Sequence, residues 1–478
     1  MDVYRIVLNY NLEKEGTKMT GLTAKKAIDE KKELLYDLAK KIWENPEIAY
    51  TEVKASKWTA DFLEDQGFKV ERKYTGIPTA IKATWGSGKP VIGFLGEYDA
   101  LPGMSQKIST TKEAIIEGGP GQGCGHNLLG VAHVGAVLGM KKEMEEKNLS
   151  GTIIFYGCPA EEVLTGKGFM ARGGAFKELD ISIAWHPSAR NKVSVGVSTG
   201  LNTVKFHFKG QTAHAGGDPH NGRSALDALE LMNVGAQYLR EHVTDDVRIH
   251  YITLEGGVAP NIVPDKASSW YFVRALSREA VEETYNRLLK IADGAAMMTE
   301  TEVEVEFLGG CYNTLQNKVL ANLIHETMQE VGLPEWTEEE LKFAEELNKV
   351  SANYDKMLAS GKITKGMQIH NEIDPIVDED SYGSTDVGDV QHIAPGVMFY
   401  TATNNIGAAG HSWQITASAG SSIGKKGMIT AAKVMAVAGI KALENLSIIE
   451  DAKAEFDSVM NGKAYKCPIT DDSPIPQP

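Results

Sequence analysis

The sequence predicts an α/β protein in which a larger domain with a mostly parallel central sheet is interrupted by a smaller α+β domain. Two observations predict this. Short apolar runs alternate with helical patterns in the first part of the chain, and a later stretch has the element order βαββαβ. Because α/β material resumes afterwards, the smaller domain is interpreted as an insertion. The predicted larger domain is residues 1–198 and 311–478, and residues 199–310 are called the inserted segment below.

Helices and buried strands alternate in the first part of the chain. Apolar residues at helical spacing over 23–44, ending at Asn45-Pro46, predict the first helix, and Trp58, Phe62 and Leu63 mark a second. Strands of a parallel sheet are covered on both faces and therefore read as continuous apolar runs. Such runs occur at 90–96, 151–157 and 180–185, with a long helical pattern over 127–147 among them.

The inserted segment begins with Val204, Phe206 and Phe208, whose alternation predicts a strand. A helix over 224–242, strands over 247–254 and 267–275, a helix over 278–298 and a strand over 301–307 follow. This order is the ferredoxin-like split βαβ arrangement. Beyond it, helices are expected over 315–331, 337–358 and 428–443, and the last of these contains two lysines and is too short to cross a bilayer.

Charge and cysteine content limit the classes of partner. The 478 residues include 64 acidic and 49 basic ones, a net charge of -15, so a broad positive face for nucleic acid or anionic lipid is not expected. The 4 cysteines contain no CxxC pair and favour a reducing compartment. The first eighteen residues lack an apolar targeting segment. We expect a cytoplasmic protein that acts on a small molecule, without a nucleic-acid or membrane partner.

Two familiar motifs do not indicate a function in this sequence. No frame of the glycine-rich run at 118–125 satisfies GxGxxG, which removes the main support for nucleotide binding. Ser198 lies in a complete GxSxG pattern, but a nucleophile elbow leads from a strand into a helix. The residues after Gly200 alternate as a strand, so the pattern is interpreted as a link between domains.

Acidic residues, histidines and one cysteine gather where predicted elements end or begin. Three predicted strands lead into loops with carboxylates or a histidine, and the long helix opens with a cysteine and a histidine between glycines. Because the carboxyl ends of parallel strands share one crevice, we expect these side chains to meet there. They are Asp99, Cys124, His126, Glu161, Glu162 and His186.

Thiolate, imidazole and carboxylate are ligands for zinc or a similar metal. Of two neighbouring glutamates, one can bind a metal while the other transfers protons. The alternative for any single cysteine or histidine is core packing, and we keep that interpretation for His133, Cys158 and Cys311. The glycines that flank Cys124 favour ligation for Cys124 and His126.

These residues belong to motifs spaced along the chain: GCGHN at 123–127, Glu161-Glu162, His186-Pro187, QTAHA at 211–215 and GHSW at 410–413. Together they resemble the metal-dependent amidohydrolases related to aminoacylases, hippurate hydrolases and indole-acetyl-amino-acid hydrolases. Within that family, LGEYDAL at 95–101, GRSALDAL at 222–229 and STDVGDV at 384–390 are similar to the branch that acts on p-aminobenzoyl-glutamate. The resemblance covers nearly the whole chain and implies that the inserted segment is a lid and dimerisation domain.

The resemblance also implies roles for individual residues. It implies two divalent metal ions, zinc or manganese, bridged by Cys124 and supported by Asp99. It implies Glu161 as the general base and His214 as the group that stabilises the oxyanion, from the partner chain in related dimers. Asn261 and Arg274 are expected to hold the substrate carboxylate, with a surface ion pair as the alternative for Arg274. The remaining implied ligands are His126, Glu162, His186 and His411.

Two departures from the family pattern bear on this site. Asn127 stands where many relatives have aspartate, which removes a nearby charge. Thr385-Asp386 stands where others have Glu-Asp, which leaves the role of the 384–390 loop open.

The resemblance implies hydrolysis of the amide bond of N-acyl or N-aroyl amino acids, with p-aminobenzoyl-glutamate as the first candidate substrate. The alternatives are a dipeptidase or N-acyl-amino-acid deacylase with another substrate, or a weakly active metal-binding partner subunit of a hetero-oligomeric hydrolase. The intact Glu161 beside Glu162 argues against the last of these. A homodimer and a hetero-oligomer with a related subunit both remain open.

Overall fold

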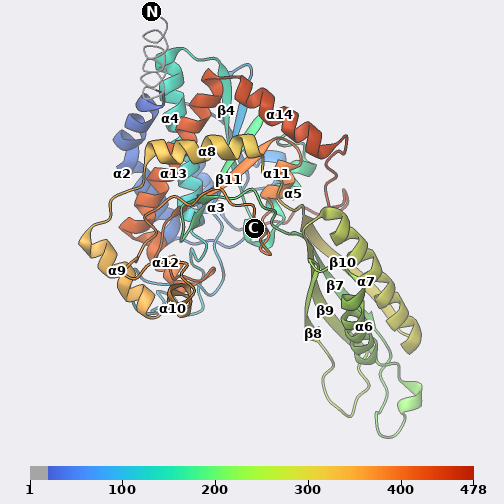
Figure 1. Ribbon diagram of the computed structural model, residues 1–478. Coiled ribbons are helices and arrows are strands. Elements are labelled where there is room, and N and C mark those ends of the chain that lie inside the picture. Colours follow the sequence, from blue (N-terminus) through green and yellow to red (C-terminus); the bar gives the residue numbers. More distant parts are fainter. Residues whose placement is uncertain (1–19) are drawn as a thin grey trace, which may run out of the picture.

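The computed structural model describes residues 20–478, in which two separate sheets form (Figure 1). The larger has the order β1-β2-β4-β3-β5-β11-β6. Its four central strands run parallel, and the strands at both edges are antiparallel. Their bounds are β1 Lys69–Arg72, β2 Ile81–Ser87, β3 Val91–Glu97, β4 Gly151–Cys158, β5 Ile181–Ser188, β6 Lys192–Val193 and β11 Gly396–Ala402. The predicted α/β class is confirmed, with a mixed rather than purely parallel sheet.

The second sheet comes from the inserted segment and is antiparallel throughout, in the order β10-β7-β9-β8. Two helices pack against it and share its apolar core. This is the predicted ferredoxin-like arrangement. The elements are β7 Gly200–Lys209, α6 Ala225–Leu239, β8 Arg248–Glu255, β9 Lys266–Ala275, α7 Arg278–Thr299 and β10 Glu302–Cys311.

The inserted segment extends away from the larger sheet (Figure 1). In its sheet, Gly200 pairs with Ala275 at the near end, and Lys209 pairs with Lys266 at the far end. Ten residues of strand span about 33 Å. The loops over 210–224 and 256–265 therefore lie at the far tip, roughly that distance from the near end.

Helices cover the larger sheet. They are α2 Leu22–Glu44, α3 Val53–Asp65, α4 His126–Lys147, α5 Gly166–Arg172, α8 Lys318–Val331, α9 Glu338–Lys349, α10 Ala352–Ala359, α11 Val387–Gln391, α12 Trp413–Gly420, α13 Ser422–Glu444 and α14 Ser447–Met460. The single helix expected over 337–358 is wrong, because the chain leaves the helical conformation at Ser351. The Ser351 hydroxyl donates to the Leu347 carbonyl, a local bond that competes with helix continuation.

None of the helices formed by residues 20–478 combines the length and the apolar character that crossing a bilayer requires. The first nineteen residues, where we expect no targeting segment and which the predicted larger domain includes, lie outside the described residues.

Helix α4 lies at the centre of the larger unit, between the sheet and helices α2 and α13. Its residues from His126 to Met140 are all buried, which is typical of a helix covered on every side. The close approach to β3 depends on Gly130, because a Cβ there would lie 2.5 Å from the Glu97 carbonyl oxygen. The start of α4 is thereby held against the end of β3.

We expect Gly130→Ala to lower the free energy of unfolding by about 1–3 kcal/mol, because the new methyl group must push α4 away from β3. Gly294→Ala in α7 is the matched control, since a Cβ there meets nothing within 4 Å. A helix-interior alanine at that position should leave stability unchanged or raise it by up to about 1 kcal/mol. Melting temperatures from calorimetry check both, and a Gly130→Ala protein that melts no lower than wild type contradicts the packing argument.

Candidate metal centre

Acidic, imidazole and thiol side chains meet at the carboxyl ends of the four parallel strands. Asp99 follows β3, the η2 turn Glu161–Val163 follows β4, and His186 lies in β5. His411 lies in the segment between β11 and α12, His126 is the first residue of α4, and Cys124 lies two residues before it. The parallel strand order brings residues from five separate segments to one point, as expected for an open α/β sheet.

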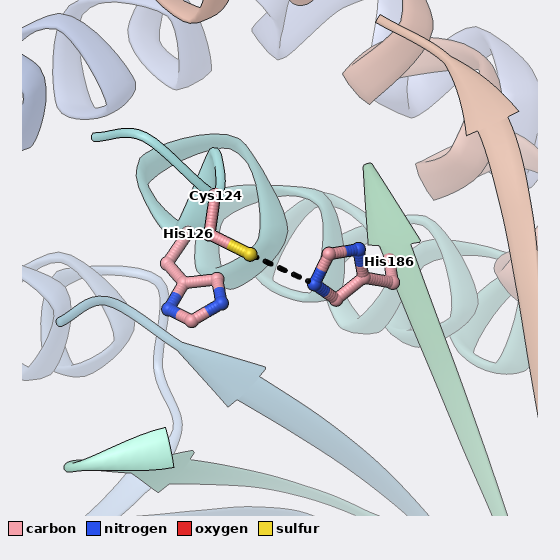
Figure 2. Close-up of side chains that lie close together, drawn as sticks. All are labelled: Cys124, His126 and His186. Carbon is pink, nitrogen blue, oxygen red and sulfur yellow. Dashed lines mark hydrogen bonds between the residues drawn. The ribbon is translucent and has the colours of Figure 1, made fainter. Parts of the chain in front are cut away.

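Cys124 and His126 face one point because Gly125 between them adopts a left-handed conformation, with φ 80°. The Cys124 Sγ lies 3.3 Å from His186 Nε2, and Figure 2 shows the rings of His126 and His186 on either side of this sulfur. One donor atom from each of these three residues lies within 4.8 Å of the others. They form the first donor group.

Both imidazoles of this group have one nitrogen already engaged. His126 Nδ1 lies 3.0 Å from the Asp99 carboxylate, and His186 Nδ1 lies 2.7 Å from the Pro187 carbonyl. Because these acceptors hold a ring proton at Nδ1, the lone pair of each ring in its neutral form is at Nε2. His126 Nε2 is buried without a hydrogen-bond partner in the structure.

A second donor group consists of Cys124, Glu162 and His411, again with donor atoms within 4.8 Å of one another. Glu162 Oε2 lies 3.6 Å from His411 Nε2, and Glu162 Oε1 is buried without a partner. The Glu162 backbone N–H donates to Asp99, so one aspartate fixes residues of both groups. Cys124 is the member that the two groups share.

The electrostatics of the centre favour positive charge. Burial raises the pKa of the Cys124 thiol to about 12 and that of the Glu162 carboxyl to about 7. Burial is the main reason that the pKa of Glu161 is raised, and the nearby negative charge of Glu97 raises it further. Burial disfavours the imidazolium of His126, yet Cys124 and Asp99 outweigh it and raise the pKa. Together with the unpartnered buried atoms, this surplus of acidic groups fits a pair of divalent cations.

A cavity of about 640 Å³ opens beside the two groups and is lined by Cys124, Glu161, Glu162, His186 and His411. Arg274, near the end of β9, reaches the same cavity from the inserted segment. Its Nη1 donates to Ser384 at 3.0 Å, and its Nε is buried without a partner. No carboxylate among residues 20–478 pairs with it, so the alternative of a surface ion pair has no support.

His214 and Asn261 do not line this cavity. They lie together in the loops at the far tip of the inserted segment, where the Ala215 N–H donates to the Asn261 carbonyl. His214 is exposed, and its Nδ1 accepts from the backbone N–H groups of Gly216 and Gly217. The ring proton of neutral His214 is therefore at Nε2, free to donate.

Sequence reasoning assigned no role to three residues beside the donor groups. Lys167 Nζ lies 2.5 Å from Glu97 and 2.5 Å from Asp386, and all three side chains are buried. Glu97 and Asp386 stand in the 95–101 and 384–390 motifs, so those motifs were the available signal. Nothing in the sequence around Lys167 marks it.

The structure gives a reason for Asn127. Its side-chain amide donates to the carbonyls of Ala39 in α2 and Ala419 in α12. These two hydrogen bonds connect α4 to both helices. An aspartate could not donate to these carbonyls. Ser198 donates to Thr314, and strand β7 follows it rather than a helix, so it forms no nucleophile elbow.

The comparisons with known proteins agree with this picture. Residues 198–297 match the family model described as a peptidase dimerisation domain. The chain is 37% identical to one of the subunits of the p-aminobenzoyl-glutamate hydrolase of Escherichia coli, over 93% of this chain and 96% of that protein. It is 29% identical to the Xaa-Arg dipeptidase of Mus musculus, over 91% of each chain.

Among solved structures, a dinuclear metal-binding peptidase of the M20 family from Bacillus subtilis superposes with a TM-score of 0.57. The match covers 86% of this chain and 98% of that one at 17% identity, so it shows a common fold.

We expect metal affinity to fall more steeply with decreasing pH below about 7, because a cation must then displace the proton of Glu162 as well as that of Cys124. Burial lowers the pKa of His186 to about 4, so His186 adds no proton near neutrality. Zinc affinities from chelator competition between pH 6 and pH 8.5 measure the slope. Glu162→Gln should bind zinc more weakly, and its affinity should not fall more steeply below pH 7. A wild-type affinity whose slope against pH is constant across this range contradicts the expectation.

Proposed function

The chain belongs to the M20 family of metal-dependent peptidases and amidohydrolases, and from this membership we propose that it hydrolyses the amide bond of N-acyl and N-aroyl amino acids. The leading substrate is p-aminobenzoyl-glutamate, which the identity to a hydrolase chain for that compound supports. The observation that carries the proposal is that Cys124 is common to both donor groups, in a cavity that also contains Glu161 and Arg274.

In this proposal Cys124 would be shared by two ions, and His126, Glu162, His186 and His411 would be the other residues that hold them. When bound, the two cations acidify the attacking water and polarise the amide carbonyl. Thiolate and imidazole suit zinc, whereas carboxylate oxygen suits manganese, and the donor set contains both kinds. Asp99 orients the centre through the His126 ring and the Glu162 backbone.

Glu161 is the proposed general base. It lies beside the metal-binding glutamate but belongs to neither group that contains Cys124. Burial and Glu97 raise the pKa of its carboxyl, which strengthens it as a proton acceptor. It takes the proton of the attacking water and then delivers that proton to the nitrogen of the leaving amino acid.

Arg274 is proposed to hold the carboxylate of the substrate. Among the described residues, its guanidinium has an unpartnered buried Nε–H and hydrogen-bonds to one side chain, that of Ser384. A carboxylate in the cavity can accept from this free edge, a charge-assisted contact that fixes the amino-acid end of the substrate. The contact with Ser384 gives the 384–390 loop a part in binding.

His214 and Asn261 need a second chain in this proposal. Both lie at the far tip of the inserted segment, about 30 Å of strand away from its near end. A second copy, or a related chain, contributes its own tip to the cavity, where His214 Nε2–H donates to the oxyanion and Asn261 contacts the substrate carboxylate. The division into residues 1–198 with 311–478 and a lid over 199–310 is part of this proposal.

The mouse relative supports a dipeptidase as the second candidate activity, with the same centre and another amino-acid amide. A weakly active partner subunit is disfavoured because Glu161 is intact and lies at the donor groups. All four cysteines are free thiols, which favours the cytoplasm as the location.

We expect the purified chain loaded with zinc or manganese to release p-aminobenzoate from p-aminobenzoyl-glutamate faster than it cleaves N-acetyl amino acids or dipeptides. Glu161→Ala should keep both metals and lose turnover by about 10²–10⁴-fold, because only proton transfer is removed. Glu145→Gln, an exposed residue of α4, is the control and should match wild type. Metal content and product release by chromatography check both, and a Glu161→Ala protein as active as wild type contradicts the mechanism.

If the partner chain supplies His214, mixing the inactive variants His214→Ala and Glu161→Ala should restore activity. In a mixed dimer, one of the two sites has the intact Glu161 of the His214→Ala chain together with the intact His214 of the Glu161→Ala chain. The other site lacks both groups. Random mixing of the two chains should then recover roughly a quarter of wild-type turnover. Activity after mixing, compared with each variant alone, measures this, and no recovery despite demonstrated chain exchange contradicts the shared site.

A further inference from the structure

Glu97 lies at the end of β3 and faces His126. Its side chain is 3% exposed, and its Oε2 has no hydrogen-bond partner among residues 20–478. This oxygen lies 3.5 Å from His126 Nε2, which is also buried and unpartnered. Glu161 Oε2 lies 3.8 Å from the same nitrogen. Donor atoms of these three buried residues lie within 4.8 Å of one another.

The contact between Glu97 and His126 does not satisfy either residue by itself. Asp99 holds the His126 ring proton at Nδ1, so a neutral ring presents a lone pair to the Glu97 carboxylate. Two electron-rich atoms at this separation, both out of water, repel one another unless a cation or a proton lies between them. The 3.5 Å separation would allow both atoms to bind one ion at about 2.0–2.2 Å. The angle between the two bonds at that ion would be about 115°, close to tetrahedral.

Lys167 fixes the orientation of this carboxylate. Its Nζ binds Glu97 Oε1 at 2.5 Å, which leaves Oε2 for His126. Asp386 in turn holds Lys167 twice, through the backbone N–H at 2.8 Å and through Nζ at 2.5 Å. One lysine shared by two buried carboxylates leaves a negative charge uncompensated, and that charge is next to the unpartnered nitrogen.

We propose that Glu97 is a further metal ligand of this centre, binding through Oε2 the ion that His126 Nε2 binds, and that Lys167 and Asp386 position its carboxylate. The inference rests on the proposed dinuclear centre and adds one residue to it. It also gives Asp386, in the 384–390 loop, a role in positioning a ligand. The alternative is that Glu97 only accepts a hydrogen bond from a doubly protonated His126.

Metal titrations of the full chain distinguish these interpretations. After chelation and dialysis, wild type and Glu97→Gln are titrated with Co²⁺, and affinity and visible absorption are recorded. We expect two ions in wild type, and in Glu97→Gln one ion with unchanged affinity and a second bound at least about 10-fold more weakly. Loss of an oxygen donor should also lower the coordination number of that ion and intensify its visible bands.

The matched control is Glu143→Gln. Glu143 is a fully buried carboxylate of the same helix as His126, but at its other end, where it accepts from Gly21 and Ala24. This variant should bind both ions as wild type does. If Glu97→Gln does not fold, a crystal structure of metal-loaded wild type decides instead. Glu97 Oε2 should then lie about 2.0–2.2 Å from an ion, and a separation beyond about 3 Å overturns the proposal.

The outcomes separate this inference from the function on which it rests. Wild type that binds fewer than two ions, or that binds two and cleaves no amide of the panel, contradicts the proposed function whatever Glu97 does. Wild type that binds two ions, with a Glu97→Gln protein of equal affinities and equal spectrum, overturns the role of Glu97 alone.

Discussion

A surplus of buried acidic groups at the carboxyl ends of four parallel strands is the constraint on which the rest of this structure depends. Lys167 is a fully buried amine that compensates only Glu97 and Asp386, while Asp99, Glu161, Glu162 and the Cys124 thiol lie within the same region. Such a concentration of charge is costly unless cations or protons offset it. The raised pKa values of Cys124, Glu161 and Glu162 express that cost, and a pair of divalent ions bound there would relieve it.

The surrounding fold holds this charged cluster rigidly. Helix α4 is buried on all sides and approaches β3 through Gly130, so the cysteine and histidine at its start have little freedom to move. Asp99 then fixes the His126 ring and the Glu162 backbone together. Two non-glycine residues adopt left-handed conformations here, His411 within the cluster and Ala160 next to Glu161. Strain of this kind is retained where the surrounding packing enforces it, which is common at functional sites.

The residues of the inserted segment that we propose to act in the site lie at its two opposite ends. Arg274 near the end of β9 contributes to the cavity of its own chain, whereas His214 and Asn261 are a full strand length away. Rigid strands cannot fold back over that distance, so the proposed roles of His214 and Asn261 require the tip of a second chain. The match of residues 198–297 to a dimerisation domain is consistent with such an assembly.

The sequence by itself determined the family, the α/β class with a ferredoxin-like insertion, and the motif residues that the strand ends gather, because apolar runs, alternation and spaced motifs are local properties of the chain. The predicted roles of those residues stay predictions. Only the tertiary structure decided which atoms are left unpartnered, such as His126 Nε2 and Glu97 Oε2, and that Lys167 and Asp386 belong to the same cluster. It also showed that His214 lies outside the cavity and that two helices form over 337–358 instead of one. These features depend on contacts between residues far apart in the chain, as between Lys167 and Asp386, and no local pattern of residues records such a contact.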